Sequence, residues 1–163
     1  MYPLSTDNYF AFYLEETLSL ANNAGAQTGE VLRIASQIRP GDFESVYSAF
    51  YYMAERVHGI ATSTNATKDP TTAREAYFRA ASYYRGADFF LHGNWSDPRI
   101  YNLWNSALND FDKAVALLDV PAERVTLKAK GSIGEYEVPA IFYKAAPCDS
   151  KRPTIVSSMF LSW

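Results

Sequence analysis

The sequence contains a single cysteine, Cys148, so no disulfide can form within the chain. A chain without disulfides agrees with a reducing compartment, and we expect the protein to be cytoplasmic. Apolar runs of about 18 residues are absent, which argues against a membrane-spanning helix. The first residues also lack the basic and then apolar pattern of a secretory signal peptide. We therefore expect no membrane partner.

Neither sign of charge is in large excess. Fifteen Lys and Arg residues stand against 18 Asp and Glu residues, a net charge of -3, so there is no basic surface for nucleic acid. One cysteine and two histidines cannot supply a Cys/His metal cluster at ordinary spacing. A glycine-rich phosphate loop and a Gly-x-Ser-x-Gly nucleophile elbow are also missing. We expect no metal and no other cofactor.

Apolar and aromatic residues are abundant. Apolar residues make up 48% of the 163 residues and aromatic residues 15%, enough for one domain with a real core. The aromatic content has two interpretations, close packing between helices or a pocket for a flat organic ligand. General experience with buried aromatic side chains favours packing.

Helical periodicity dominates the first two thirds of the sequence. Apolar residues recur at three- and four-residue spacing in five segments, residues 10–21, 31–38, 43–61, 73–91 and 100–118. Asp42 is expected to cap the third segment, and Thr72 with Glu75 forms a capping-box pattern before the fourth. Asp97 and Pro98 are expected to begin the fifth.

Two of these segments have distinctive faces. The fourth is rich in alanine, which lets neighbouring helices approach closely, so we expect it to be central. The apolar face predicted for the fifth helix consists of Ile100, Leu103, Trp104, Leu108, Phe111, Val115 and Leu118.

The period changes near residue 121. Residues 125–129 alternate as in a half-buried strand, and residues 136–143 predict a second strand after turn residues at 131–134. Pro139 cannot donate to a sheet, which indicates that the second strand lies at an edge. Residues 153–161 predict a third strand.

The predicted fold class is therefore mainly α with a small β part. About five helices form an N-terminal, cap-like region over residues 1–121, and the first two or three strands of an incomplete sheet occupy residues 122–163. So short a sheet would leave an edge and a face open to water.

The densest polar stretch is "REAYFRAASYYRGADFFLHGNWSDPR", residues 74–99. Arg85 and Asp88 are three residues apart and have aromatic neighbours on both sides. The favoured interpretation is a structural ion pair at a helix junction. The alternative is a ligand site in which Arg85 or Asp88 orients a bound molecule. The candidate substrate contacts are Tyr83, Tyr84, Arg85, Asp88, Phe89 and Phe90.

Neither histidine has a sequence context typical of catalysis. His58 lies within the third helical segment, where a satisfied or exposed helix residue is favoured over a general base. His92 lies at the end of the fourth segment, where a cation suits the helix dipole. No catalytic residue is assigned.

Four motifs carry a resemblance to a known family: "GDFESVYSAFYYMAERV", "AREAYFRAASYYRGADFFLHGNWSDPRI", "PAERVTLKAKG" and "RPTIV". They resemble fungal α/β-hydrolases of polyketide and hybrid polyketide–nonribosomal peptide clusters. These clusters make fusarin- and cytochalasin-type compounds or shorten melanin precursors. The resemblance covers residues 7–156, nearly the whole chain.

The resemblance implies a fold and a mechanism. In this family a helical region packs against an α/β-hydrolase domain, and the segment from Arg124 onward resembles the first strands of that domain. A glycine-rich oxyanion loop then follows, and later the catalytic Ser, Asp and His. Residues 157–163 of this chain depart from that pattern, and no position matches a member of the triad. The resemblance therefore indicates a hydrolase truncated at its C-terminal side.

The function that this resemblance implies is hydrolysis in fungal secondary metabolism, by C–C or acyl cleavage or by hydrolase-assisted ring closure. The implied partners are a polyketide-derived small molecule and a second copy of the chain. Whether the chain is itself an enzyme stays open, because the catalytic core is absent, and we expect it to be inactive. The alternative is a helical interaction or scaffold module without catalysis, and a third possibility is a chain with no function of its own.

Overall fold

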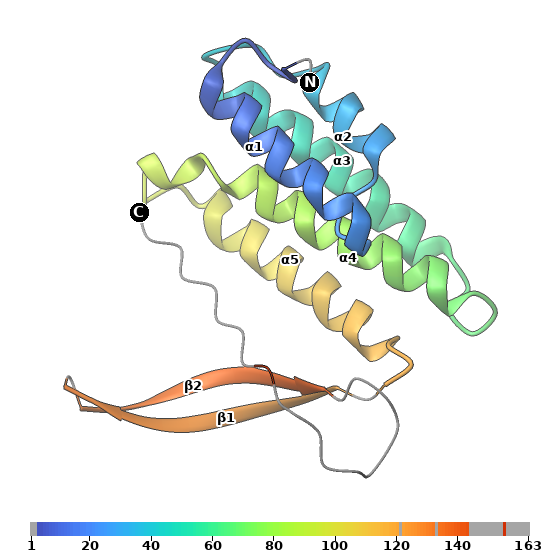
Figure 1. Ribbon diagram of the computed structural model, residues 1–163, viewed down its shortest axis with the longest axis vertical. Helices are drawn as coiled ribbons and strands as arrows, with labels where there is room; N and C mark the ends of the chain where they lie inside the picture. The colour runs from blue at the N-terminus through green and yellow to red at the C-terminus, as the bar shows by residue number, and fades with distance from the viewer. Residues whose placement is uncertain (1–2, 121, 133, 144–154, 156–163) are drawn as a thin grey trace. The chain divides into compact units, whose positions relative to one another are not determined.

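The computed structural model describes residues 3–120, 122–132, 134–143 and 155. The chain divides into two compact units, Met1–Asp119 and Val120–Trp163, and each is described by itself. Within the described residues, the first unit contains five α-helices and two short 3-10 helices, and the second contains a two-stranded sheet (Figure 1). The chain is therefore mainly helical with a small β part, as the sequence predicts.

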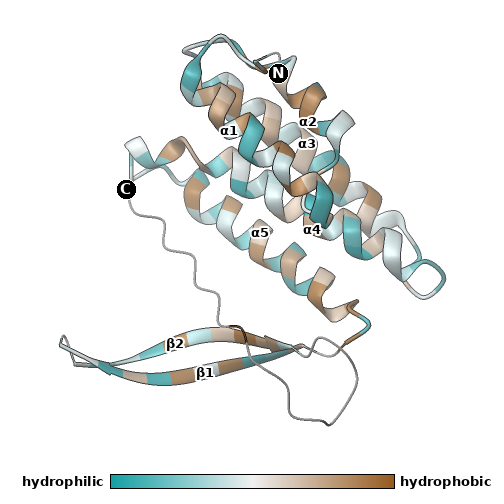
Figure 2. Cartoon of the chain, viewed as in Figure 1, coloured by the Kyte–Doolittle hydropathy of each residue, from teal (hydrophilic) through white to brown (hydrophobic). Residues whose placement is uncertain are grey.

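Each predicted helical segment corresponds to one observed α-helix. In chain order the first unit contains α1 (Asn8–Ser19), η1 (Leu20–Asn23), α2 (Thr28–Ala35), α3 (Phe43–Ser63), α4 (Pro70–Asp88), η2 (Leu91–Gly93) and α5 (Arg99–Ala116). Figure 2 shows hydrophobic and hydrophilic residues interspersed along these helices. This pattern is expected of helices that bury one face.

Asp7, Asp42 and Asp69 cap the first turns of α1, α3 and α4. Asp42 accepts a hydrogen bond from the backbone N–H of Ser45 at the start of α3, as predicted. The capping box predicted at Thr72 is wrong, because α4 begins at Pro70. Asp69 accepts from the backbone N–H of Thr72 at 3.0 Å. Pro70 has no N–H that would need an acceptor in the first turn, so the helix begins there, earlier than predicted.

The alanine-rich helix α4 is central, as its composition predicts. It packs against both α3 and α5 (Figure 1). Its buried residues include Ala73, Ala76, Ala80 and Ala87. The packing leaves no room for a side chain at Gly86, where an added Cβ atom would overlap Cδ1 of Phe50 on α3. The space normally taken by a side chain of α4 is therefore filled by a ring of α3.

The buried face of α5 differs in part from the predicted one. Ile100 and Leu103 are buried as expected, but the rest of the buried face is Ala107, Asp110 and Ala114. Trp104, Leu108 and Phe111 belong to the predicted face yet are between 37% and 46% exposed. The physical reason is the close packing on α4: small side chains fit between the two helices, and the bulky row beside them is displaced toward solvent.

The second unit is an antiparallel hairpin of β1 (Ala122–Gly131) and β2 (Gly134–Tyr143). Gly131 pairs with Gly134 across the predicted turn, and Gly134 has a φ of 114°, a value that glycine adopts easily. Pro139 lies opposite Thr126 in the register. Leu127 is exposed, so the half-buried pattern predicted for β1 is not found at this residue.

The predicted third strand, residues 153–161, lies outside the described residues except for Ile155, which is exposed. The interpretation of the second unit as the beginning of a hydrolase sheet stays a prediction. The same holds for the cap-like role of the first.

Candidate functional site

The six predicted substrate contacts lie on the last turns of α4 and directly after it. Tyr83 is fully buried and faces α2: its hydroxyl donates to Glu30 Oε2 at 2.7 Å and accepts from the backbone N–H of Gln27 at 2.9 Å. Burial, assisted by the bond to Glu30, raises the pKa of Tyr83 above its usual range. Arg79 also contacts Glu30, at 3.0 Å. Tyr83 thus joins α4 to the beginning of α2.

Tyr84, the next residue, faces α3 instead. Its hydroxyl donates to Glu55 Oε1 at 2.6 Å. Burial is the main cause that raises the pKa of Tyr84, and the neighbouring Glu55 adds to it. Successive residues of a helix project about 100° apart, so the two tyrosines cannot share one face.

Phe89 and Phe90 belong to an aromatic cluster that links the end of α4 to α1 and α3. Phe89 stacks on Tyr13 with ring centroids 4.0 Å apart. Phe90 makes an edge contact with Phe10 at 5.3 Å and a tilted contact with Phe43 at 5.4 Å between ring centroids. Packing accounts for these contacts. A ligand contact of Tyr83, Tyr84, Phe89 or Phe90 stays a prediction.

Arg85 and Asp88 form the ion pair that their spacing suggested, and a third residue joins them. Arg85 Nη1 donates to Asp88 Oδ2 at 2.6 Å, and His92 Nε2 lies 2.9 Å from the same oxygen. The Asp88 side chain is 1% exposed. Its other oxygen, Oδ1, is buried and has no hydrogen-bond partner among the described residues. A buried carboxylate needs charged or hydrogen-bonding partners, and Arg85 and His92 supply them.

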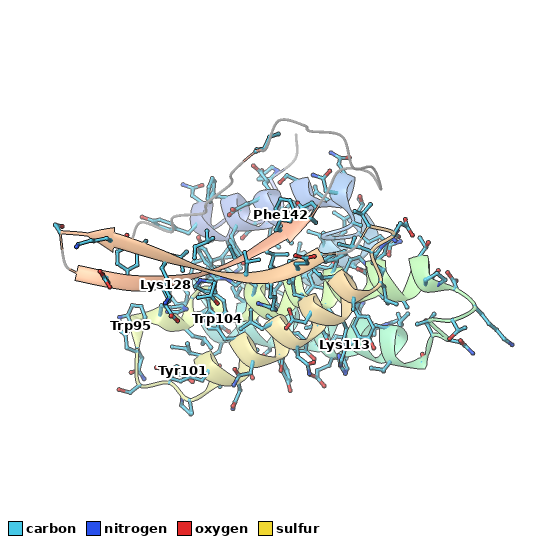
Figure 3. All side chains as sticks on the ribbon, turned by 90° about the horizontal axis from the view of Figure 1, so that it is seen from below. Trp95, Tyr101, Trp104, Lys113, Lys128 and Phe142 are labelled. Atoms are coloured by element: carbon cyan, nitrogen blue, oxygen red, sulfur yellow. The ribbon has the colours of Figure 1, made fainter. Side chains whose placement is uncertain are left out.

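Two tryptophans flank these three residues. The guanidinium carbon of Arg85 lies 5.0 Å from the centroid of Trp104, which is on α5. The ring of His92 meets the edge of Trp95 at 4.9 Å. We call Arg85, Asp88, His92, Trp95 and Trp104 the tryptophan-flanked cluster. In Figure 3, Trp95 and Trp104 lie toward the beginning of α5, and Lys113 lies toward its end.

Sequence reasoning missed the two tryptophans. Trp95 follows His92 by three residues, a spacing that could have drawn attention to it. Trp104 lies on another helix, 19 residues beyond Arg85, and no local pattern connects the two. Only the packing of α5 against α4 brings them together.

The other histidine also bonds to a buried aspartate. His58 Nδ1 on α3 donates to Asp110 Oδ2 on α5 at 2.8 Å. The Asp110 side chain is 1% exposed, and Lys113 Nζ lies 3.6 Å from its Oδ1. The pair joins two helices that flank α4.

Each histidine is thus held by a carboxylate, as in part of a catalytic triad. The hydrogen bonds that join them to other described residues go to aspartates and not to a serine. A serine nucleophile needs a base within hydrogen-bond reach. The arrangement around Arg85 can bind and orient polar groups, but the described residues show no nucleophile for acyl transfer.

The described residues contain no helix with the length and apolar character needed to cross a membrane. They also contain no group of three or more His, Cys, Asp or Glu residues arranged to hold a metal ion.

Comparison with known proteins identifies relatives of the chain, although no protein-family model matches it. It is 32% identical over 161 residues to Hydrolase LUC6 of Fusarium sp, covering 97% of this chain and 38% of the relative. It is 34% identical over 147 residues to 20-hydroxy-prefusarin hydrolase FUS2 of Gibberella moniliformis, covering 90% and 34%. It is 28% identical over 155 residues to Alpha/beta hydrolase gkaG of Penicillium citrinum, covering 95% and 36%.

The chain therefore spans little more than a third of the length of these relatives, while they match nearly all of it. The names agree with the resemblance carried by the sequence motifs. This chain belongs to the family of fungal α/β-hydrolases of secondary-metabolite biosynthesis.

Proposed function

We propose that the chain serves the biosynthesis of a polyketide or hybrid polyketide–peptide, and that its helical unit contacts the polyketide-derived molecule. The observation that carries this proposal is the match of nearly the whole chain to named hydrolases, one of which is a 20-hydroxy-prefusarin hydrolase. The reaction of the complete family fold would be serine-hydrolase cleavage of a C–C or acyl bond, or an assisted ring closure. A cytoplasmic location, expected from the single cysteine, is part of the proposal.

We further propose that this chain, as its sequence stands, does not hydrolyse esters. His58 and His92 are the two histidines of the sequence, and their hydrogen bonds to described residues go to Asp110 and Asp88. The sequence also lacks the nucleophile elbow that would expose a serine.

An esterase assay tests this. Purified chain is incubated with an activated ester such as p-nitrophenyl butyrate, and the release of nitrophenol is followed with and without a serine-reactive inhibitor. We expect the same rate as in buffer containing an equal mass of albumin. A rate above that control which disappears after inhibitor treatment would show an active serine and contradict the proposal. A serine esterase that cleaves this ester serves as the positive control.

A non-catalytic function is the second candidate, and the exposed side of α5 favours it. Tyr101, Leu108 and Phe111 lie seven and three residues apart on α5 and are all exposed. Such a row is typical of the seam between two helices. The residues of α5 include two basic and two acidic side chains, so two copies would not repel each other strongly. We propose a second copy of the chain as the partner on this row.

Light scattering during size-exclusion chromatography measures this self-association. We expect a dimer for the unaltered chain and a monomer for the double variant Leu108→Gln with Phe111→Gln, because the polar replacements remove the apolar contact. Phe12→Gln is the matched control, since Phe12 is an exposed ring on α1 away from this row, and it should stay dimeric. A monomeric unaltered chain would contradict self-association through this row. A scaffold function would then need a different partner there.

A further inference from the structure

The guanidinium group of Arg85 has an unused side. Its Nη1 atom donates to Asp88, and among the described residues no other hydrogen-bond acceptor contacts Arg85. A guanidinium group carries five N–H donors in a planar fork, so the edge formed by Nε and Nη2 is left for another acceptor. The side chain is 25% exposed, which allows a molecule from solvent to reach it.

Arg99 also lies over an aromatic ring, but its guanidinium group has no unoccupied donor edge. Its guanidinium carbon lies 4.4 Å from the ring centroid of Tyr47, much as Arg85 lies over Trp104. Arg99, however, donates from Nη1 and Nη2 to Glu44 and from Nε and Nη2 to Asp97. Both edges of its fork are occupied, so Arg99 is a matched internal comparison for Arg85.

Two neighbours surround the guanidinium group of Arg85. Asp88 is buried and accepts from Nη1, and the ring centroid of Trp104 lies 5.0 Å from the guanidinium carbon. Asp88 Oδ2 also lies 2.9 Å from His92 Nε2, so this oxygen is not bound by Arg85 alone. Trp95 and Trp104 are 70% and 39% exposed and offer ring surfaces on which a flat group can stack.

We propose that the tryptophan-flanked cluster binds the acidic end of a planar conjugated acid, a carboxylate or an enolate. The two oxygens of the acid accept from Nε and Nη2 of Arg85, which is the geometry of a bidentate arginine–carboxylate pair. The conjugated chain lies against Trp104. This inference rests on the proposed function and narrows its ligand to an anionic, conjugated class.

The test uses sorbate, a short conjugated dienoate, and sorbyl alcohol, which has the same carbon chain without the charge. Affinities of the full chain are measured by ligand-observed NMR. We expect sorbate to bind about tenfold more tightly than the alcohol, the difference that one charge-assisted bidentate contact supplies. Arg85→Lys should weaken sorbate binding about tenfold and leave the alcohol unchanged, because lysine keeps the charge and loses the planar fork.

Arg99→Lys is the control and should leave both affinities unchanged, because the fork of Arg99 is already occupied. Circular dichroism checks the fold of each variant. If Arg85→Lys does not fold, Trp104→Ala retains the ion pair and should weaken both probes about fivefold through lost stacking. Equal affinities of the two probes, no binding of either, or sorbate binding that resists every folded variant would overturn the inference. The measurement does not involve hydrolysis, so it can fail while the proposed function stands.

Discussion

His58→Ala is expected to lower the free energy of unfolding by about 3 kcal/mol, because it leaves the Asp110 carboxylate buried without its nearest partner. Only Lys113, at 3.6 Å from Oδ1, would remain beside the charge among the described contacts of Asp110. Chemical denaturation near neutral pH measures the change. A loss below about 1 kcal/mol would show that water or Lys113 replaces the imidazole easily.

The double-mutant cycle with Asp110→Ala separates the charge from the packing. Removing both partners eliminates the unpaired carboxylate, so the double variant should be more stable than the sum of the single losses predicts. Asp112→Ala is unsuitable as a control, since this residue makes a contact of its own. Glu15→Ala, an exposed acidic residue on α1, should change the stability by less than about 0.5 kcal/mol.

Gly86→Ala is expected to destabilise the helical unit by about 2 kcal/mol, although alanine normally favours a helix over glycine by about 1 kcal/mol. The new Cβ atom would lie 2.4 and 2.6 Å from two ring carbons of Phe50, and a buried ring cannot move away without disturbing its own neighbours. Overpacking therefore outweighs helix propensity at this position. Thermal and denaturant unfolding of the purified variant measure the difference.

Gly59→Ala on α3 is the matched control, because nothing lies within 4 Å of the Cβ atom it would add. It should stabilise the chain by about 0.5–1 kcal/mol. Phe50→Leu in the Gly86→Ala background should recover part of the loss by making room for the methyl group. If both glycine variants changed stability in the same direction, the contact between Gly86 and Phe50 would not limit packing.

The helices could be predicted from the sequence because their signals are local. The apolar period located α3 and α4, and Asp42 marked where α3 begins. The start of α4 was misplaced because Thr72 and Asp69 compete for the same helix end, and the aspartate with Pro70 wins. A pattern of three or four residues cannot decide such a competition.

The buried face of α5 could not be predicted from the sequence pattern alone. Bulky apolar residues were expected inside, yet Ala107 and Ala114 are buried and Leu108 is exposed. Which of two neighbouring rows turns inward depends on the size of the side chains of α4, and this is information from another helix. Residue type alone favours the larger row, and packing selects the smaller one.

Only the contacts between residues close in the sequence could be predicted for the candidate site. Arg85 and Asp88 are three residues apart, a spacing that places both on one side of a helix. The bond between His58 and Asp110 spans 52 residues, and the contact of Arg85 with Trp104 joins two helices. Long-range pairs of this kind follow from tertiary packing, which the sequence pattern does not specify.

The small side chains of α4 limit which substitutions this helix can accept. Because its buried residues are mostly alanines, α3 and α5 lie close enough for His58 and Asp110 to form a hydrogen bond beside it. Larger residues on its buried faces would move the flanking helices apart and lengthen that hydrogen bond. The hydrogen bond between His58 and Asp110 therefore limits the size of the side chains that α4 can accept. A change from alanine to a larger residue in α4 should be accompanied by apolar replacement of His58 and Asp110 together.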